Sequence, residues 1–283
     1  MTTAPHLEPG IAAASDRYAA AVLPVGPLVI RTAADGLLAG VVQIEVNGVS
    51  LPAYRAAPAA SLPAGSSWPV VLVISEIFGV HAHIADVARR FAQLGYLAIA
   101  PELFVRQGDA GAYTDIPRLM DEVVRRVPDA QVMADLDAVV AWAATQGGDL
   151  NRLGVTGFCW GGRQTWLYAA HNPAVRVGVA WYGRLEGPTG PLQPHHPVDI
   201  AAELKAPVLA LYGAADEGIP LASVERMQAA LKLGNAHARD SEFVIYPDAP
   251  HAFHADYRPG YRAAPAQDGW ARCLAALRGH GVV

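Results

Sequence analysis

Residues 152–171, which read RLGVTGFCWGGRQTWLYAAH, decide the fold of this chain. The apolar run LGVTG at 153–157 predicts a buried strand, and a helix is expected to follow the next few residues. Between them lies Gly157-Phe158-Cys159-Trp160-Gly161, a G-x-C-x-G sequence. A strand that turns sharply into a helix, with one reactive side chain at the turn, is typical of α/β proteins built on a central sheet.

The residue types around Cys159 fit a strained turn that presents a nucleophile. Such a turn needs small residues two positions before and two after its apex, and Gly157 and Gly161 fill these positions. The thiol would lie at a helix N-terminus, whose positive end favours the reactive thiolate. We expect the backbone N–H of Trp160 to serve as one oxyanion donor. The alternative is that Cys159 is a small buried hydrophobic residue and the glycines only form a turn.

Short apolar runs alternate with helical patterns along the rest of the chain, which predicts an α/β fold. Because the runs are apolar almost throughout, they indicate a mostly parallel sheet covered by helices on both faces. An Asn47-Gly48 turn predicts a hairpin that adds antiparallel strands at one edge. The predicted strands lie at residues 70–75, 96–100, 153–157, 177–183, 208–213 and 242–247, and the helical patterns at 84–94, 132–143 and 224–231.

No linker divides the chain, so we predict one α/β domain at residues 40–283. Residues 1–39 are rich in alanine, with scattered proline and glycine, and we interpret them as an N-terminal extension whose structure the sequence does not determine.

Composition excludes several classes of protein. The chain has 283 residues, 52% of them hydrophobic and 17% charged, which argues against disorder over most of its length. A net charge of −5 gives no basic footprint for nucleic acid. Two cysteines exclude a disulfide framework and fit a reducing compartment. With no basic leader and no run of 18 apolar residues, we expect a cytoplasmic protein without a membrane partner.

An acid and a base follow the cysteine in the chain order that such a turn requires, which is nucleophile, acid, histidine. Asp216 comes just after the predicted strand at 208–213, and His251 comes just after the strand at 242–247. Asp216 would orient the imidazole of His251, which would accept the thiol proton. Glu217 is the alternative acid and His254 the alternative base.

A further carboxylate, Glu76, stands at the end of the predicted strand 70–75. A carboxylate there is costly unless it is paired or functional. The same loop normally supplies the second oxyanion donor, for which the N–H of Ile77 is the candidate. The alternative is that Glu76 is a solvated loop residue.

Together these segments resemble the dienelactone hydrolases, the cysteine branch of the α/β-hydrolase superfamily. The resemblance covers about residues 40–283, and the motifs in order are far more specific than any one of them. They are SEIFGV (75–80), YLAIAPELFVRQG (96–108), GFCWGG (157–162), WYG (181–183), YGAADEGIP (212–220) and YPDAPHAF (246–253).

The resemblance implies a mechanism in which Cys159 attacks a lactone carbonyl, an acyl-enzyme forms, and water activated by His251 hydrolyses it. Glu76 matches a carboxylate that lies near the resting thiol and shifts on substrate binding to help form the thiolate. The best-known members of the family hold the substrate carboxylate with an arginine shortly after the catalytic histidine. Here Arg258 and Arg262 lie further along the chain, so the sequence does not determine whether either of them binds a substrate carboxylate.

Several other residues are candidates for the walls of a pocket. Tyr182, Trp181, His254 and Arg258 could line it, whereas the pair at 195–196 in a proline-rich loop is expected at the surface. His81 and His83 form an H-x-H after Glu76. We expect this pair to start a helix or to shape the pocket, and we expect no metal and no cofactor.

The sequence therefore predicts a hydrolase of a small carboxylic ester or lactone that works through Cys159, His251 and Asp216. One alternative is a general carboxylesterase on the same fold. Another is a catalytically silent binding or thiol-sensing protein that keeps the fold. The sequence leaves the physiological substrate and the oligomeric state open.

Overall fold

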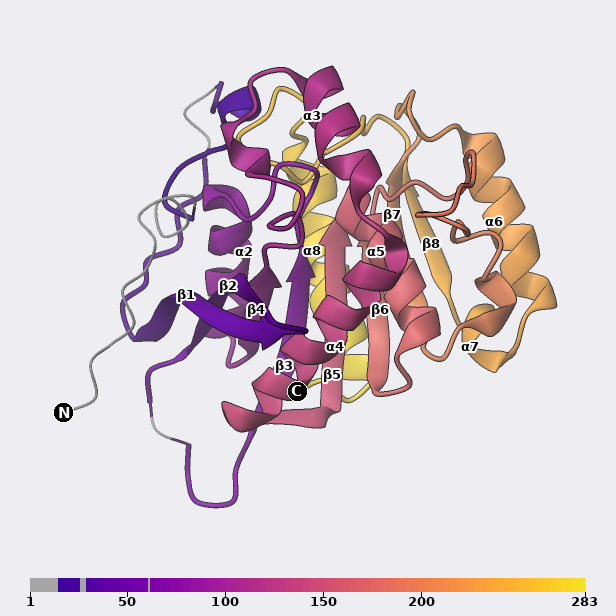
Figure 1. Ribbon diagram of the computed structural model, residues 1–283. Helices are drawn as coiled ribbons and strands as arrows, with labels where there is room; N and C mark the ends of the chain where they lie inside the picture. Colours follow the sequence, from indigo (N-terminus) through magenta and orange to yellow (C-terminus); the bar gives the residue numbers. More distant parts are fainter. Residues whose placement is uncertain (1–14, 26–28, 61) are drawn as a thin grey trace.

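A single eight-stranded sheet forms the centre of the molecule (Figure 1). The computed structural model describes residues 15–25, 29–60 and 62–283. The strand order is β1-β2-β4-β3-β5-β6-β7-β8. The strands are β1 (Leu37–Val46), β2 (Val49–Pro58), β3 (Trp68–Ile74), β4 (Leu97–Pro101), β5 (Gly148–Phe158), β6 (Val175–Trp181), β7 (Val208–Gly213) and β8 (Glu242–Tyr246).

The pairing confirms the mostly parallel sheet. Strands β4, β3, β5, β6, β7 and β8 pair in parallel in that order, whereas β1 and β2 are antiparallel to each other and β2 is antiparallel to β4. The predicted hairpin forms at Asn47 and Gly48, whose φ angles of 51° and 78° suit a tight two-residue turn. The side chains of Val70 to Ile74 in β3 are fully buried, as a strand covered on both faces requires.

Helices cover both faces of the sheet (Figure 1). On one face α4 and α5 pack together, and on the other Phe91 of α2 contacts Trp270 of α8 with ring centroids 4.6 Å apart. The helices are α2 (Ala82–Gln93), α3 (Ile116–Glu122), α4 (Asp129–Thr145), α5 (Trp160–His171), α6 (Leu221–Leu233), α7 (Ala236–Arg239) and α8 (Ala263–Gly279). Short 3-10 turns are η1 (Ala20–Val22), η2 (Ala110–Ala112), η3 (Val124–Arg126) and η4 (Ala201–Glu203).

One strand begins earlier than the apolar pattern predicts. Strand β5 starts at Gly148 rather than near residue 153, because Gly148 and Asp149 pair with the start of β3. The polar residues there are satisfied locally: Arg152 donates to Asp149 and to Ser67. An apolar sequence pattern therefore does not predict residues 148–152 of the strand, because most of them are polar.

The described part of residues 1–39 lies against the α/β domain. The carbonyl of Arg17 accepts a hydrogen bond from the N–H of Ala82 (2.8 Å), and the carbonyl of Tyr257 accepts one from Val25 (3.2 Å). Strand β1 already begins at Leu37, so the predicted boundary at residues 39 and 40 falls inside the first strand. Residues 1–14 and 26–28 of the predicted extension lie outside the described residues. In the described part of the chain, none of the helices has the length and apolar character needed to cross a membrane.

Candidate active site

Cys159 occupies the strained turn that the sequence predicts. It joins β5 to α5 with φ 54° and ψ −112°, in a region where side chains other than glycine are rare. A Cβ atom on Gly157 would lie 2.2 Å from the carbonyl oxygen of Gly161, and one on Gly161 would lie 2.3 Å from that of Ile74. Both glycines are therefore required, because the helix start and the end of β3 approach the turn too closely for any side chain.

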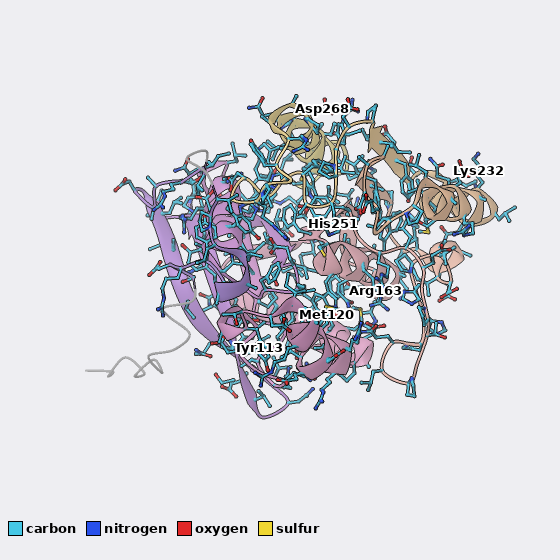
Figure 2. The ribbon with its side chains drawn as sticks, turned by 90° about the horizontal axis from the view of Figure 1, so that it is seen from above. Tyr113, Met120, Arg163, Lys232, His251 and Asp268 are labelled. Carbon is cyan, nitrogen blue, oxygen red and sulfur yellow. The ribbon has the colours of Figure 1, made fainter. Side chains whose placement is uncertain are left out.

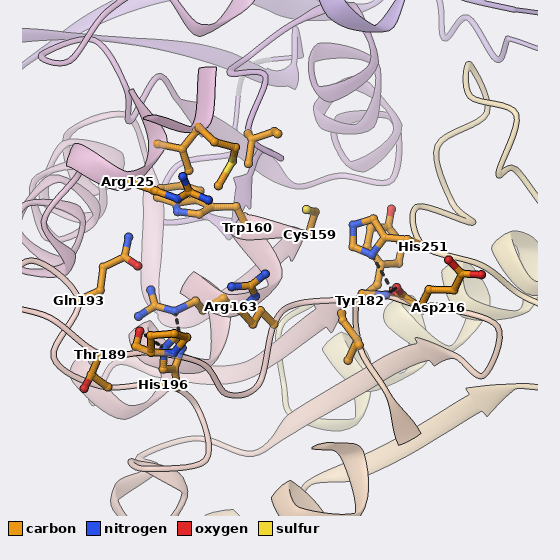
Figure 3. A pocket seen from close by; sticks show the side chains of 18 of the residues that line it. Arg125, Cys159, Trp160, Arg163, Tyr182, Thr189, Gln193, His196, Asp216 and His251 are labelled. Carbon is orange, nitrogen blue, oxygen red and sulfur yellow. Dashed lines mark hydrogen bonds and ion pairs between the residues drawn. The ribbon is translucent and has the colours of Figure 1, made fainter. Parts of the chain in front are cut away.

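His251 and Asp216 meet beside the turn, each from the loop after a parallel strand. The Nδ1 atom of His251 lies 2.7 Å from Oδ2 of Asp216 (Figure 3). Asp216 is buried and also accepts a hydrogen bond from the N–H of Gly218, whereas the adjacent Glu217 is exposed. The side chain of His251 remains 37% exposed, so one edge of the imidazole faces the cavity. Figure 3 shows Cys159 directed towards this same space.

The surroundings of His251 favour its protonated form. Burial opposes protonation, but the charge of Cys159, hydrogen bonds to Asp216 and Cys159, and the charge of Asp216 outweigh it and raise the pKa of His251 to about 10. An imidazolium beside the thiol stabilises a thiolate, which is the form that attacks carbonyl carbon.

Two backbone amides flank the cysteine. Ile77, after β3, and Trp160, the first residue of α5, line the same cavity as Cys159. Within the described residues, neither backbone N–H has a hydrogen-bond acceptor. Backbone N–H donors beside a thiol are the kind of group that can stabilise a developing oxyanion.

Glu76 is buried, which contradicts the alternative of a solvated loop carboxylate. Its Oε1 accepts a hydrogen bond from the hydroxyl of Tyr257 (3.0 Å), and its Oε2 lies 3.4 Å from Nε2 of His81. Burial would raise the pKa of Glu76, but the charge and hydrogen bond of His81 and the charge of His83 lower it below its ordinary value. The carboxylate is thus held by these neighbours, and Glu76 is not among the residues that line the cavity.

His83 and His254 lie in a buried layer beneath the site. Nδ1 of His83 is 3.2 Å from Oδ1 of Asp256, whose other oxygen accepts a hydrogen bond from Arg90 at 2.9 Å. His254 packs against both Phe158 and Trp181, with ring centroids 5.0 and 4.6 Å away. Burial, with the nearby charges of His83 and Arg90, holds the pKa of His254 well below its ordinary value, so this ring is neutral.

Of the four pocket candidates, only Tyr182 lines the cavity. Trp181 and His254 are fully enclosed in the aromatic layer behind it. The guanidinium of Arg258 lies over the ring of Phe78, 5.6 Å from its centroid, and that of Arg262 donates to the carbonyls of Pro259 and Tyr261. Neither arginine lines the cavity, because the turn after His251 directs this segment towards the N-terminal residues instead.

The cavity has a volume of about 990 Å³, and much of its wall comes from segments that the sequence did not single out. Met120, Val124 and Arg125 come from α3 and η3, and a loop at 188–193 closes the opposite side. Seen from above, Met120, Arg163 and His251 gather near the middle of the molecule although they are far apart in the chain (Figure 2).

His196 corrects one expectation. It was predicted at the surface, but it is buried and lines the cavity, because Nε of Arg163 donates to its Nδ1 (3.4 Å). Arg163 also forms two hydrogen bonds with Asp129 of α4. The proline-rich composition of this loop gives no signal of that buried anchor.

Comparison with known proteins identifies the family. The model of the Dienelactone hydrolase family matches residues 51–281. The chain belongs to the dienelactone hydrolase family. It is 58% identical over 267 residues to a "Putative carboxymethylenebutenolidase" of Methylorubrum extorquens, covering 94% of this chain and 89% of the relative. A protein of the same name from Salmonella typhimurium is 55% identical over 257 residues, covering 91% and 93%.

A crystal structure titled "Putative Dienelactone Hydrolase" from Klebsiella pneumoniae is also similar. It shares 56% identity with a TM-score of 0.82, and the match covers 86% of this chain and 98% of that one. Acylaminoacyl peptidase of Pyrococcus horikoshii, at 15% identity and a TM-score of 0.61, shares the fold alone. The chain therefore has the α/β-hydrolase fold and is a hydrolase of the dienelactone hydrolase type, which excludes the catalytically silent alternative.

Proposed function

We propose that this dienelactone hydrolase family member cleaves carboxylic esters or lactones through a Cys159–His251–Asp216 triad and an acyl-enzyme. The observation that carries the proposal is the strained turn at Cys159, which opens into the same cavity as an imidazole held by a buried carboxylate. No cofactor takes part in the proposed steps.

The first half of the reaction forms the acyl-enzyme. The sulfur of the Cys159 thiolate attacks the carbonyl carbon, and the electron pair of the C=O bond moves to its oxygen, where the N–H groups of Ile77 and Trp160 stabilise it. When the carbonyl re-forms, the bond to the alcohol oxygen breaks. The His251 imidazolium gives its proton to that oxygen, and in a lactone the leaving oxygen stays attached to the acyl group.

The second half regenerates the enzyme. His251 removes a proton from water as the water oxygen attacks the thioester carbon, and the resulting tetrahedral intermediate expels the Cys159 thiolate. The acid product leaves with the oxygen from water, and the imidazolium–thiolate pair is restored. Asp216 keeps the imidazole in one orientation through both halves and stabilises its positive charge.

Glu76 enters this proposal as a carboxylate that moves towards the Cys159 thiol when substrate binds and helps to form the thiolate that the His251 imidazolium then stabilises. Its resting contacts are with Tyr257 and His81. Movement towards the thiol would break both contacts, so the two residues set the free energy needed for the shift.

The free thiol suggests where the enzyme works. Cys159 and Cys273 are both unpaired, and a reducing compartment keeps a catalytic thiol in that state. We therefore place the activity in the cytoplasm.

Substitution of the nucleophile tests the proposal directly. We expect Cys159→Ala to lower kcat for p-nitrophenyl acetate by about a thousandfold or more, because the acyl-enzyme route is lost. The matched control is Cys273→Ala, which removes a buried thiol on α8 outside the cavity and should keep the wild-type kcat. Near-normal turnover by Cys159→Ala would refute the nucleophile, and mass spectrometry should find the acetyl group on Cys159.

A general carboxylesterase is the second candidate, which the size of the cavity favours. A panel of small lactones and open-chain esters separates the two by their kcat/KM values. A preference for open-chain esters over every lactone would favour the esterase.

A further inference from the structure

The cavity extends from Cys159 in a direction away from His251. In Figure 3, His251 and Asp216 lie on one side of the cysteine, whereas Arg125, Gln193 and Thr189 lie on the other. A volume of about 990 Å³ is at the upper end of the range for pockets that enclose drug-sized ligands. A monocyclic lactone of a few carbon atoms would leave most of this space unfilled.

The proposed chemistry assigns this empty side to one part of the substrate. His251 protonates the leaving oxygen, so the alcohol part of an ester lies on the His251 side of Cys159. The acyl group, bound to the same carbonyl carbon, is then directed to the opposite side. On that side the cavity is lined by the polar residues Arg125, Thr189 and Gln193 (Figure 3). Val124, Pro191 and Leu192 lie next to these residues in the chain or between them and, with Met120 and Trp160, supply apolar lining; we call these five residues the acyl arm.

The arginines that line the same cavity are either paired with carboxylates or exposed to water. Arg125 forms an ion pair with Asp121, and Arg163 forms one with Asp129. Arg184 also lines the cavity, but its side chain is exposed, so water screens its charge. The acyl arm therefore offers apolar contact rather than a fixed counter-charge.

We propose that the acyl arm binds an apolar acyl chain or ring, so that the preferred substrates are esters of medium-sized apolar carboxylic acids. This inference rests on the proposed function, because the direction of the acyl group follows from the roles of Cys159 and His251. Each methylene buried in the arm should raise kcat/KM about threefold to fourfold until the arm is filled.

A series of p-nitrophenyl esters tests this substrate class. We expect kcat/KM to rise from acetate through butyrate to hexanoate, whereas lengthening the alcohol part of acetate esters should give no comparable rise. Met120→Trp fills the arm and should lower the hexanoate-to-acetate ratio about tenfold. Leu233→Trp, on an exposed position of α6 outside the cavity, should keep the ratio.

The outcomes separate this inference from the proposed function. If Cys159→Ala is inactive but kcat/KM is flat or falls with acyl length, the acyl arm is wrong and the triad stands. If Met120→Trp lowers acetate and hexanoate turnover equally, the arm does not bind the acyl group. If Cys159→Ala retains turnover, the proposed function itself fails.

A different observation concerns the described N-terminal residues 15–25 and 29–36, which we call the N-terminal strap. It lies outside residues 51–281, which match the family. The ring of Tyr18 packs on Tyr257 and His81, with centroids 5.0 and 5.8 Å away, and these two residues hold Glu76. The strap is also tied to the start of α2, because the N–H of Ala82 donates to the carbonyl of Arg17.

These contacts act on the turn that carries the oxyanion donor. Glu76 immediately precedes Ile77, so packing that holds the backbone of this turn also fixes the N–H group of Ile77 beside Cys159, whereas the Glu76 side chain can still rotate. Displacement of a catalytic group by about 1 Å can cost up to a hundredfold in rate. The same strap contacts the deeper layer, where the N–H of Ile30 donates to Asp256 (3.2 Å).

We also infer that Tyr18 is a positioning residue, which fixes the Glu76–Ile77 turn through the rings of His81 and Tyr257. Tyr18→Ala should lower kcat for p-nitrophenyl acetate about tenfold with KM within twofold of wild type. Tyr18→Phe keeps the ring and should restore kcat. The control is Val22→Ala, which removes buried contacts of the same strap where η1 packs against η2 and should leave kcat unchanged.

Alkylation of Cys159 by iodoacetamide separates positioning from unfolding. It needs no oxyanion donor, so its rate should stay near wild type in Tyr18→Ala. Unchanged kcat in Tyr18→Ala, an equal loss in Tyr18→Phe, or a loss of alkylation that parallels the loss of kcat would each refute the inference.

Discussion

Two of the carboxylate–histidine pairs around the site, Asp216–His251 and Glu76–His81, differ chiefly in their access to the cavity. Asp216 and His251 are 2.7 Å apart, and the imidazole side chain is 37% exposed. Glu76 and His81 are 3.4 Å apart, and the imidazole is 2% exposed. A histidine can move protons to and from a substrate only where its free nitrogen reaches the cavity. The comparison therefore supports our proposal that the first pair transfers protons and that the second has a positioning role.

Removing the exposed imidazole should have the largest effect. His251→Ala should lower kcat by about a thousandfold or more, because both proton transfers are lost. Steady-state kinetics with p-nitrophenyl acetate measures this. The control is His237→Ala, on the exposed surface of α7, which should behave as wild type. A loss below about tenfold in His251→Ala would break the distinction between the two pairs.

The strained turn at Cys159 should be intolerant of a single added methyl group. Gly161→Ala places a Cβ atom 2.3 Å from the carbonyl oxygen of Ile74, so the helix must move away from β3. Overpacking of this kind costs about 1–3 kcal/mol of unfolding free energy. Gly279→Ala, at the end of α8 with no heavy atom within 4 Å, should not destabilise the protein. Urea unfolding of the two variants measures the difference, and equal stability would show that the turn can relax.

The stability of the protein should depend on the hydroxyl of Tyr257, which donates to the buried carboxylate of the Glu76–His81 pair. Tyr257→Phe removes a hydroxyl that donates to Glu76 and leaves a buried carboxylate short of a partner, which costs about 1–3 kcal/mol. Tyr113→Phe makes the same change where the acceptor, Glu122, is 38% exposed, and should cost less than about 0.5 kcal/mol because water replaces the donor. Thermal or urea unfolding compares the variants. Similar losses of unfolding free energy in the two variants would mean that the burial of Glu76 does not increase the cost of removing its hydrogen-bond donor.

The smallest effect should be the contribution of His251 to the pH dependence of the free energy of unfolding. The pKa of His251 is raised from an unfolded value of 6.5 to about 10, so its stabilising contribution is complete below pH 6.5 and is lost as pH rises towards 10. Because the ring is over a third exposed, we expect the contribution to stay below about 1 kcal/mol. Unfolding at pH 6.5 and pH 9.5 should show a smaller decrease in His251→Gln than in wild type. An equal decrease would locate the pH dependence elsewhere.

The sequence by itself determined the features that local chemistry imposes. Apolar runs and helical spacing predicted the six parallel strands, and the hairpin followed from Asn47-Gly48. The strained turn at Cys159 followed from glycines two residues away on either side. These features depend on residues within about ten positions of one another, where periodicity and steric limits act directly.

Only the tertiary structure decided which side chains meet. Asp216 and Glu217 are equivalent in sequence, but only Asp216 contacts His251. The hydroxyl that holds Glu76 comes from Tyr257, 181 residues away, and the walls of the acyl arm come from α3 and the loop at 188–193. The N-terminal strap likewise reaches its partners across the fold. Such contacts depend on how the strands order themselves in the sheet and how loops pack over it, and no local pattern encodes the distance between two segments that only folding brings together.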